Sequence, residues 1–313
     1  MFVLGKIGRF LTVDAAGACG KRKRRTCCCG GYSIARSIGT GGFGRVHECS
    51  SSSDDDELFA VKILNKTRSG RSDEFTARRI RDEINVMRSL SGCPQVAGFV
   101  DTCEDLTHVY IVMELCRGGD LNAYVKRRGA LGEPALREVA DQVLRMLSTC
   151  HARGIVYGDV KPANFCIVDP IRPTVVKTVD FGCSRYVVEE GRRFDTLSGT
   201  PAFMAPEVFK RSYSYKSDIY SLGVMLYWLS SQRFPLLGKE IESMSMREID
   251  ALRTFGDVSH DLRRRLGPVL SPEAVDFIGM CLMPEARRPS ATDALNSRWI
   301  SRTPPPSTNT LID

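Results

Sequence analysis

The chain has no uninterrupted run of about 18 apolar residues, so a membrane-spanning helix is not expected. It has 12 cysteines but only four histidines, and no cysteine pair with zinc-ligand spacing is matched by a partner pair. We therefore expect reduced, partly buried thiols rather than a zinc site. The loop pattern Asp-x-Asp-x-Asp-Gly is missing as well, so no built-in calcium sensor of the EF-hand type is expected.

The net charge of +7 is unevenly distributed along the 313 residues. Residues 1–30 contain seven basic residues and one acid, so six of the seven net positive charges lie in this segment. The remainder is close to neutral, which gives no electrostatic reason to expect nucleic-acid binding. Apolar residues make up 42% of the chain, which is ordinary for a globular protein with a substantial core.

Both ends of the chain differ in composition from the part between them. Residues 1–31 form an extension in which the basic block 21–25 precedes three consecutive cysteines, 27–29. Three functions stay open for it: a membrane anchor with acylated thiols beside basic residues, a nuclear-localisation signal, or part of an organelle-targeting peptide. A disordered, solvated tail is the simpler alternative. Residues 301–313, with three consecutive prolines, are expected to be disordered.

The segment 32–300 changes from strand patterns to helical patterns. Runs that suit strands occupy residues 32–38, 45–49, 58–64 and 109–115. Helical spacing of apolar residues begins around Ile80 and dominates beyond Asp120, where residues 219–229 are apolar on most sides. We predict an α+β fold with two lobes, a small β-rich lobe over residues 32–115 and a larger, mainly helical lobe over residues 116–300.

Glycines interrupt the first pair of predicted strands. Comparable spacing marks dinucleotide sites, but there the glycines open a helix, whereas here another strand follows. Without side chains, the backbone of such a hairpin can lie close over the phosphates of ATP. A flexible turn is the alternative that the motif alone leaves open. The phosphate-binding interpretation assigns nucleotide contacts to Ile38, Gly39, Thr40, Gly41, Gly42, Phe43, Gly44 and Val46.

Lys62 lies among apolar residues of the third predicted strand, where a cation is unfavourable unless an anion meets it. ATP phosphates and a glutamate are the natural partners. Glu83 is the best candidate for the glutamate, because it shares a helical face with Ile80, Met87 and Leu90; Asp82 and Glu74 are weaker alternatives. A glutamate on an isolated helix would more often be a solvated charge.

Four polar residues follow in an order that suits phosphoryl transfer. Asp159 would accept or orient the proton of an attacking hydroxyl, and Lys161 would neutralise the migrating phosphoryl group. Asn164 and Asp180, the latter in Asp-Phe-Gly, would hold Mg²⁺, which bridges the phosphates of ATP. Each residue alone is ordinary surface chemistry, but the ordered set together with the glycine hairpin and Lys62 is specific.

With these motifs, residues 32–300 resemble eukaryotic-type protein kinases. The resemblance continues through 199–207, which looks like the end of an activation segment, and through 217–223, which resembles the central buried helix. Arg288 lies where the family keeps an arginine that pairs with the glutamate of Ala-Pro-Glu, here Glu207. Lys161 and Thr200 match the serine/threonine form. Residues 112–121 and 161–165 resemble the calcium/calmodulin-dependent group, and most of all the catalytic domain of plant and protist calcium-dependent kinases without their calcium-binding half.

The resemblance implies how ATP is held. Backbone groups of Glu114 and Cys116 would meet the adenine in a hinge, and Met113 would be the gatekeeper residue. The ring would lie between three small or apolar side chains, those of Val46, Ala60 and Cys166. Asp120 matches the acid that receives an arginine three positions before the target residue, although contact with the ATP ribose alone is the alternative.

Two departures from the family pattern affect control and specificity. Gly158 replaces the arginine that precedes the catalytic aspartate and that binds a phosphate on the activation segment in many relatives. Thr196 occupies the position commonly phosphorylated, with Arg185 as its remaining partner, and we expect its phosphorylation to have little or modest effect. Ala163 and Trp228 replace acids that relatives use for a basic residue two positions before the target.

The leading hypothesis is a monomeric serine/threonine kinase that acts on protein substrates and uses ATP and Mg²⁺. A pseudokinase scaffold is the alternative, but only Gly158 favours it, and the segment 199–207 disfavours a small-molecule kinase. We expect a cytoplasmic protein, with membrane or nuclear association through residues 1–30 as alternatives.

Overall fold

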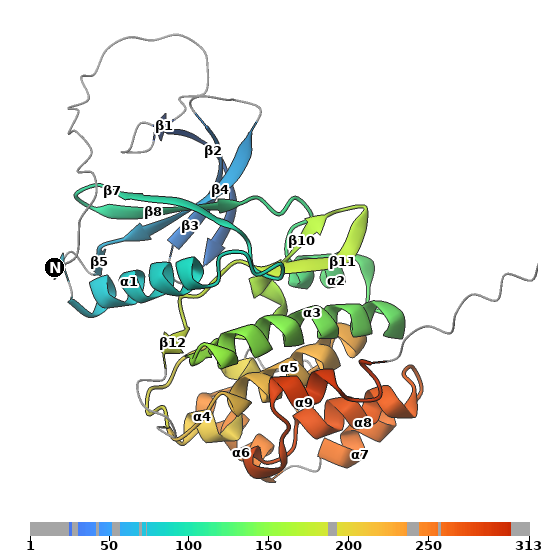
Figure 1. The fold of residues 1–313 in the computed structure, drawn as a ribbon. Helices are drawn as coiled ribbons and strands as arrows, with labels where there is room; N and C mark the ends of the chain where they lie inside the picture. The colour runs from blue at the N-terminus through green and yellow to red at the C-terminus, as the bar shows by residue number, and fades with distance from the viewer. Residues whose placement is uncertain are drawn as a thin grey trace, which may run out of the picture. The chain divides into compact units, whose positions relative to one another are not determined.

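The computed structural model describes residues 25–26, 31–41, 44–51, 57–68, 71–72, 74–186, 193–236, 244–255 and 258–301. They form two compact units (Figure 1). The first consists of the described residues up to Ile80 and of Phe99–Leu115; the second consists of Arg81–Gly98 and of those from Cys116 onward. The first unit is rich in strands and the second mainly helical, which confirms the predicted α+β fold with two lobes.

A six-stranded sheet, in the order β1-β2-β3-β4-β8-β7, forms most of the first unit. Its neighbouring strands are antiparallel, and the small hairpin β5-β6 stands apart from it. The strands of this unit are β1 (Arg25–Thr26), β2 (Tyr32–Gly41), β3 (Gly44–Ser51), β4 (Leu58–Asn65), β5 (Thr67–Arg68), β6 (Arg71–Ser72), β7 (Phe99–Glu104) and β8 (His108–Glu114).

Strand β1 lies inside the segment expected to be an extension, because Arg25 pairs with Ile34 and Thr26 with Ser33 of β2. A strand of two residues carries too little periodicity to be predicted from sequence. The cysteines 27–29 and most of the basic block lie outside the described residues. Residues 302–313 of the predicted tail lie outside them as well.

One face of the sheet carries a small apolar core. Ile34, Cys49, Val61 and Val112 are buried there, each on a different strand. Tyr32, Phe59, Ile63, Cys103 and Tyr110 pack against them, and the rings of Tyr32 and Phe59 meet edge to face at 5.9 Å. This core occupies one side of β4, so the alternate residues of that strand point to the other side.

Helix α1 (Glu74–Ser89) crosses the division between the units, and the other helices belong to the second. These are α2 (Leu121–Arg128), α3 (Glu133–Ala152), α4 (Pro206–Phe209), α5 (Lys216–Ser231), α6 (Met246–Phe255), α7 (Val258–Arg265), α8 (Pro272–Cys281) and α9 (Ala291–Leu295). Single turns of 3₁₀-helix among the described residues are η1 (Pro162–Asn164), η2 (Pro201–Phe203) and η4 (Glu285–Arg287). The short strands are β9 (Ile155–Val156), β10 (Phe165–Asp169), β11 (Arg172–Thr178) and β12 (Arg185–Tyr186).

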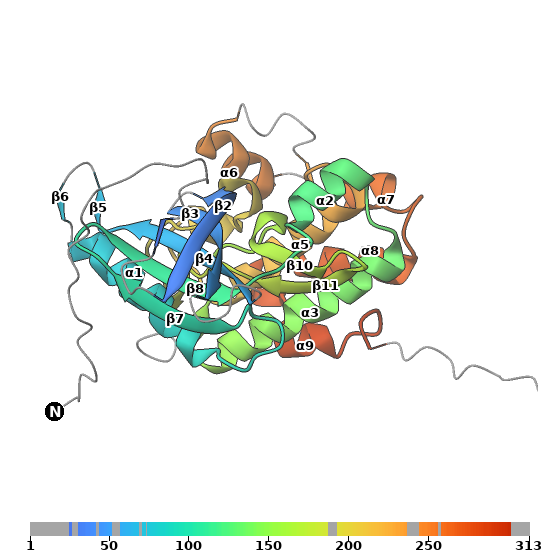
Figure 2. The ribbon, with the colours of Figure 1, turned by 90° about the horizontal axis from the view of Figure 1, so that it is seen from above.

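Helix α5 is the centre of the second unit. It is buried from Ser217 to Ser230 except at Ser221, as its apolar composition predicts. It packs against α3 and α8, and α9 packs against α3 (Figures 1 and 2). Among the residues that the structure describes, no helix is both long and apolar enough to cross a bilayer.

Candidate active site

In the first unit, the glycine-rich hairpin is the turn between β2 and β3. Its register pairs Gly39 with Val46, Thr40 with Arg45 and Gly41 with Gly44; the predicted contacts Gly42 and Phe43 lie outside the described residues. A Cβ added to Gly44 would lie 2.2 Å from the carbonyl oxygen of Ile63 on β4. The sheet itself therefore requires glycine at this position, a reason that adds to the predicted approach of the hairpin backbone to phosphates.

The predicted nucleotide-binding side chains of this unit share one face of the sheet. Residues two apart on a strand, and residues paired across antiparallel strands, lie on the same face. The register pairs Gly39 with Val46, Val46 with Lys62, and Ala60 with Met113. All five therefore lie opposite the apolar core described above. Ile38, just before this group on β2, is 42% exposed.

Lys62 is a cation, yet it is only 4% exposed, and its neighbours along β4 are apolar. In the second unit, Glu83 is 3% exposed and shares its face of α1 with buried Ile80, Met87 and Leu90, as the spacing predicts. A solvated charge at Glu83 is thus excluded. The two weaker candidates are more accessible to solvent than Glu83: Asp82 is half-buried and Glu74 is exposed. The pairing of Lys62 with Glu83 stays a prediction.

In the second unit, the predicted catalytic segment, residues 157–164, and Thr200 bring three charged or polar side chains together. Lys161 Nζ lies 2.7 Å from Asp159 Oδ2 and donates to Thr200 Oγ1 over 2.8 Å. The Thr200 hydroxyl donates in turn to Asp159 Oδ1 over 2.8 Å, and its backbone amide donates to the same atom over 2.9 Å. Thr200 thus bonds to both partners, a role that the sequence did not reveal.

Asn164 fixes the other side of this carboxylate. Its Nδ2 donates to the backbone oxygen of Asp159 over 2.9 Å and to Oδ2 over 3.1 Å. Because the nitrogen of the Asn164 side chain is used in these bonds, its oxygen is the atom that would bind a cation. Asp180 accepts from the backbone amide of Gly182 over 2.9 Å. An amide oxygen and a carboxylate are ligands that Mg²⁺ prefers, so the two predicted metal residues fit that ion.

A buried carboxylate holds the backbone of the catalytic segment. Asp218 on α5 is 1% exposed and accepts from the amides of Tyr157 and Gly158 over 2.9 and 2.8 Å. It also contacts His151 Nε2 over 2.9 Å. The sequence contained a signal for this role: a carboxylate inside a helix that is apolar on most sides must find partners.

Gly158 has a φ of +80°, a conformation that glycine adopts without strain. A Cβ there would lie 2.8 Å from the carbonyl oxygen of Cys183. Glycine at residue 158 therefore suits the backbone conformation that the hydrogen bonds to Asp218 hold.

The predicted adenine-binding segment belongs to both units, with Glu114 ending β8 in the first. In the second, the turn 116–120 is bonded to β10, because Gly118 donates to Ile167 O and Ile167 donates to Gly119 O. Asp120 and Cys166 face each other in an isolated bridge. Burial raises the pKa of the Cys166 thiol well above its usual range, which keeps it neutral, as an apolar floor requires.

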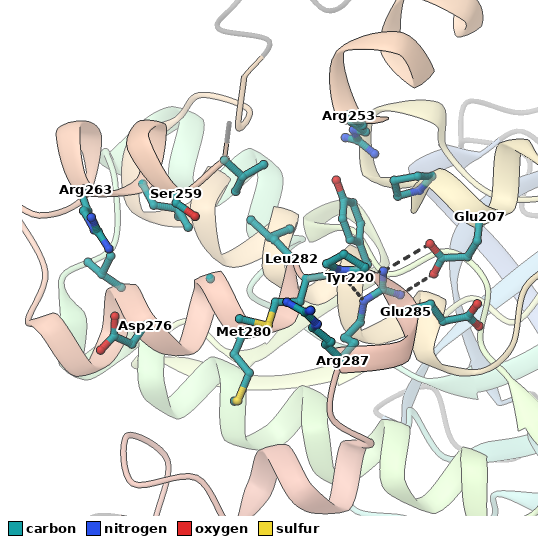
Figure 3. Close-up of a pocket in the computed structure, with 18 of the residues that line it drawn as sticks. Glu207, Tyr220, Arg253, Ser259, Arg263, Asp276, Met280, Leu282, Glu285 and Arg287 are labelled. Carbon is teal, nitrogen blue, oxygen red and sulfur yellow. Dashed lines mark hydrogen bonds and ion pairs between the residues drawn. The ribbon is translucent and has the colours of Figure 1, made fainter. Parts of the chain in front are cut away.

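Glu207 and Arg288 form the ion pair that the resemblance implied. Arg288 is 1% exposed, and its guanidinium donates to both carboxylate oxygens over 2.5 and 3.3 Å (Figure 3). It lies over the ring of Tyr220, 5.0 Å from the centroid. The pair ties the end of the segment 199–207 to the turn that follows α8.

Comparison with known proteins defines the class. The family model for the protein kinase domain matches residues 32–300, so the chain belongs to the protein kinase family.

Among its relatives, CDPK-related kinase 3 of Arabidopsis thaliana is 32% identical over 275 residues. These cover 86% of this chain and 44% of the relative. Calcium-dependent protein kinase 32 of the same plant is 33% identical over 270 residues, 86% of this chain and 48% of the relative. Calcium/calmodulin-dependent serine/threonine-protein kinase 1 of Oryza sativa subsp. japonica is 32% identical over 278 residues, 87% of this chain and 44% of the relative. The chain spans about half the length of these relatives.

The predicted resemblance to the catalytic domain of calcium-dependent serine/threonine kinases is thereby confirmed. Members of the family use ATP and Mg²⁺ in general.

Proposed function

We propose that the chain is an active serine/threonine protein kinase, which transfers a phosphoryl group from ATP to hydroxyl groups of proteins. The observation that carries this proposal is the contact of Asp159 with both Lys161 and Thr200. A carboxylate fixed from two sides can orient the proton of an incoming hydroxyl, and the adjacent ammonium group can compensate the charge that develops on the phosphoryl group.

Asn164 and Asp180 would hold Mg²⁺, which would screen the charge of the ATP phosphates. Lys62, buried on the same sheet face as Val46, Ala60 and Met113, would meet the phosphates as a cation. Lys62 lies within β4 and Asn164 ends η1, whereas Asp180 lies two residues after the end of β11.

For substrate choice, we propose a basic residue three positions before the target. Asp120 caps α2, because its Oδ1 accepts from the amide of Ala123 over 2.8 Å. The second carboxylate oxygen can then receive a cationic side chain. Ala163 is exposed and Trp228 is 7% exposed, and neither side chain carries a charge, so no preference is expected two positions before the target. A peptide array without basic selection at the third upstream position would contradict this proposal.

We further propose that the activation segment holds its position with little help from a phosphate on Thr196. Arg193 pairs with Glu285 at 2.5 Å, and Phe194 exchanges two backbone hydrogen bonds with Tyr213. The hydroxyl of Tyr213 donates to the backbone oxygen of Thr196 over 2.9 Å. These contacts fix the segment without any phosphate. Arg185, the remaining candidate partner, donates to the carbonyl of Ser184 over 2.8 Å.

Thr196→Ala should therefore retain most of the activity. Gly158→Arg should make the activity more sensitive to phosphorylation of Thr196, and Gly158→Ala is the matched control, since both variants place a Cβ at a positive φ. Loss of turnover in Thr196→Ala, or equal phosphorylation sensitivity in the Arg and Ala variants, would refute the proposed control.

The test of the proposed activity is incubation of the full chain with labelled ATP, Mg²⁺ and a basic peptide. Label should appear on serine or threonine with the native chain and fall by several orders of magnitude with Asp159→Asn. Label with neither protein, while ATP still binds, would indicate a scaffold that transfers no phosphate.

A further inference from the structure

A hollow of about 720 Å³ lies in the second unit and contains none of the catalytic residues (Figure 3). It is bordered by helices α4, α6, α7 and α8 and by the turn η4. Its volume is in the range of pockets that hold a small molecule or a few side chains of a peptide. The proposed phosphoryl transfer gives this hollow no role.

The floor of the hollow is apolar. Val275, Met280 and Leu282 contribute from α8 and the residue after it, and Leu262 contributes from α7. The ring of Tyr220 forms part of the wall. An occupant with at least one apolar side chain fits this surface.

The charges around this floor are mainly positive. Among the described lining residues, the two acids Glu207 and Glu285 already pair with Arg288 and Arg193. Asp276 is then the remaining carboxylate. The remaining cationic residues that line the hollow are Lys210, Arg253, Arg263 and Arg287. This excess of positive charge favours an acidic occupant.

Arg253 adds a second, independent observation. It is only 6% exposed, lies over Tyr220 at 5.5 Å from the ring centroid, and its Nε has no hydrogen-bond partner within the described part of the chain. Its other nitrogens donate to the backbone oxygens of Ala202 and Met204, in the segment that follows Thr200. A buried guanidinium with an unsatisfied N–H is unfavourable until an acceptor reaches it.

We propose that this hollow binds an acidic segment of a protein substrate, with an apolar side chain on the floor and carboxylates at the arginines. Arg253, Arg263 and Arg287 stand on different sides of the hollow around Leu282 (Figure 3). One compact anion would reach one of them, whereas a peptide with spaced carboxylates reaches several. The docked segment would also contact, through Arg253, the residues that follow Thr200. The identification of the occupant as a substrate rests on the proposed kinase function.

The binding test uses the full chain and a fluorescein-labelled decapeptide in which glutamates flank two central leucines. Its counterpart carries lysines in place of the glutamates. We expect the acidic peptide to bind at least tenfold more tightly than the basic one, and more weakly as salt increases. The double variant Arg263→Glu/Arg287→Glu should weaken binding about tenfold or more, since two attractive charges become repulsive.

Arg264→Glu is the matched control. Arg264 lies on α7 next to Arg263. Its side chain is 62% exposed, and it does not line the hollow. Arg264→Glu should leave the affinity for the acidic peptide within about twofold of the native value, because exposed charges outside an interface contribute little. Equal weakening by Arg264→Glu and by the double variant, or equal binding of the two peptides, would overturn the proposal. Displacement of the acidic peptide by millimolar inorganic phosphate would also overturn it, in favour of a small-anion site.

A kinetic measurement distinguishes docking of the acidic segment from catalysis. Joining the acidic segment to a basic substrate peptide should lower KM about fivefold or more, and the double variant should abolish this gain while leaving KM for the short peptide unchanged. If the kinase function fails, Asp159→Asn and the native chain will both be inactive while peptide binding persists. If the docking proposal fails, the short peptide will be phosphorylated normally and the acidic segment will give no gain.

Discussion

Replacing Thr200 with valine removes one hydroxyl group and keeps the shape of the side chain. That hydroxyl donates to Asp159 Oδ1 and accepts from Lys161 Nζ, each over 2.8 Å. Three contacts of the Asp159 carboxylate survive the change: the ammonium group of Lys161 at 2.7 Å, the backbone amide of Thr200 at 2.9 Å and Nδ2 of Asn164 at 3.1 Å. The carboxylate of Asp159 should therefore stay in place but lose one of the hydrogen bonds that restrain its orientation.

The structure sets the expected size of the effect. A hydrogen bond to a charged group contributes about 1.5–3 kcal/mol net. The side chains of Asp159 and Lys161 are 10% and 24% exposed, so solvent screens the interaction only partly. Because three contacts of Asp159 remain, we expect the lower end of this range, about 1.5–2 kcal/mol, which corresponds to a fall in kcat of about 10–30-fold.

The assay is initial-rate phosphorylation of a basic peptide at saturating ATP and Mg²⁺. Thr200→Ser keeps the hydroxyl and should retain kcat within about threefold, while KM for ATP should change little in both variants. A valine variant with native kcat would show that the hydroxyl does not orient Asp159. A serine variant as slow as the valine variant would show that packing of the methyl group, not the hydrogen bond, is what matters.

Three further predictions concern the second unit. Asp218→Asn places an amide nitrogen against backbone donors, so we expect a loss of about 1–3 kcal/mol of stability and a lower kcat, measured by denaturant unfolding and initial rates. Arg288→Met leaves Glu207 without its buried partner and should destabilise the protein by about 3–5 kcal/mol, whereas the double variant with Glu207→Leu should recover part of this loss. Burial opposes ionisation of Glu285, but hydrogen bonds from Arg193 and Ser214 outweigh it and hold its pKa below 4.5. The stabilisation from this carboxylate is therefore present above about pH 4.5 and lost as the pH falls through the lower folded-state pKa, and Glu285→Gln should remove this component from the pH dependence of unfolding.

Much of the candidate site could be predicted because its chemistry is local in sequence. Asp159, Lys161 and Asn164 lie within six consecutive residues, and their order, together with the glycine hairpin and Lys62, predicts phosphoryl transfer. The burial of Glu83 also followed from local spacing, since a helix brings residues three and four apart to one face. The hairpin of β2 and β3 could be predicted from glycines between two runs that suit strands.

What could not be predicted depends on contacts between distant segments. Thr200 meets Asp159 across 41 positions, and Asp218 meets Tyr157 across 61. Such contacts are set by how helices pack, which periodicity within one helix does not specify. The same holds for Arg253, whose burial against the segment after Thr200 has no local signal, because arginines on α6 would ordinarily be solvated.

The contacts found only in the structure support the proposal that glycine at residue 158 is compatible with catalysis. The amide of Gly158 donates to Asp218, its φ is +80°, and the next residue, Asp159, contacts Thr200 and Lys161. The position of the catalytic carboxylate is thus fixed from the buried helix α5 and from the activation segment, without an arginine at residue 158. We propose that an arginine at residue 158 would add a phosphate contact on the activation segment and is not needed to support Asp159. If this is correct, Asp218→Asn should lower kcat far more than Gly158→Ala does. The opposite order would show that the backbone conformation at residue 158, and not its anchoring by α5, limits catalysis.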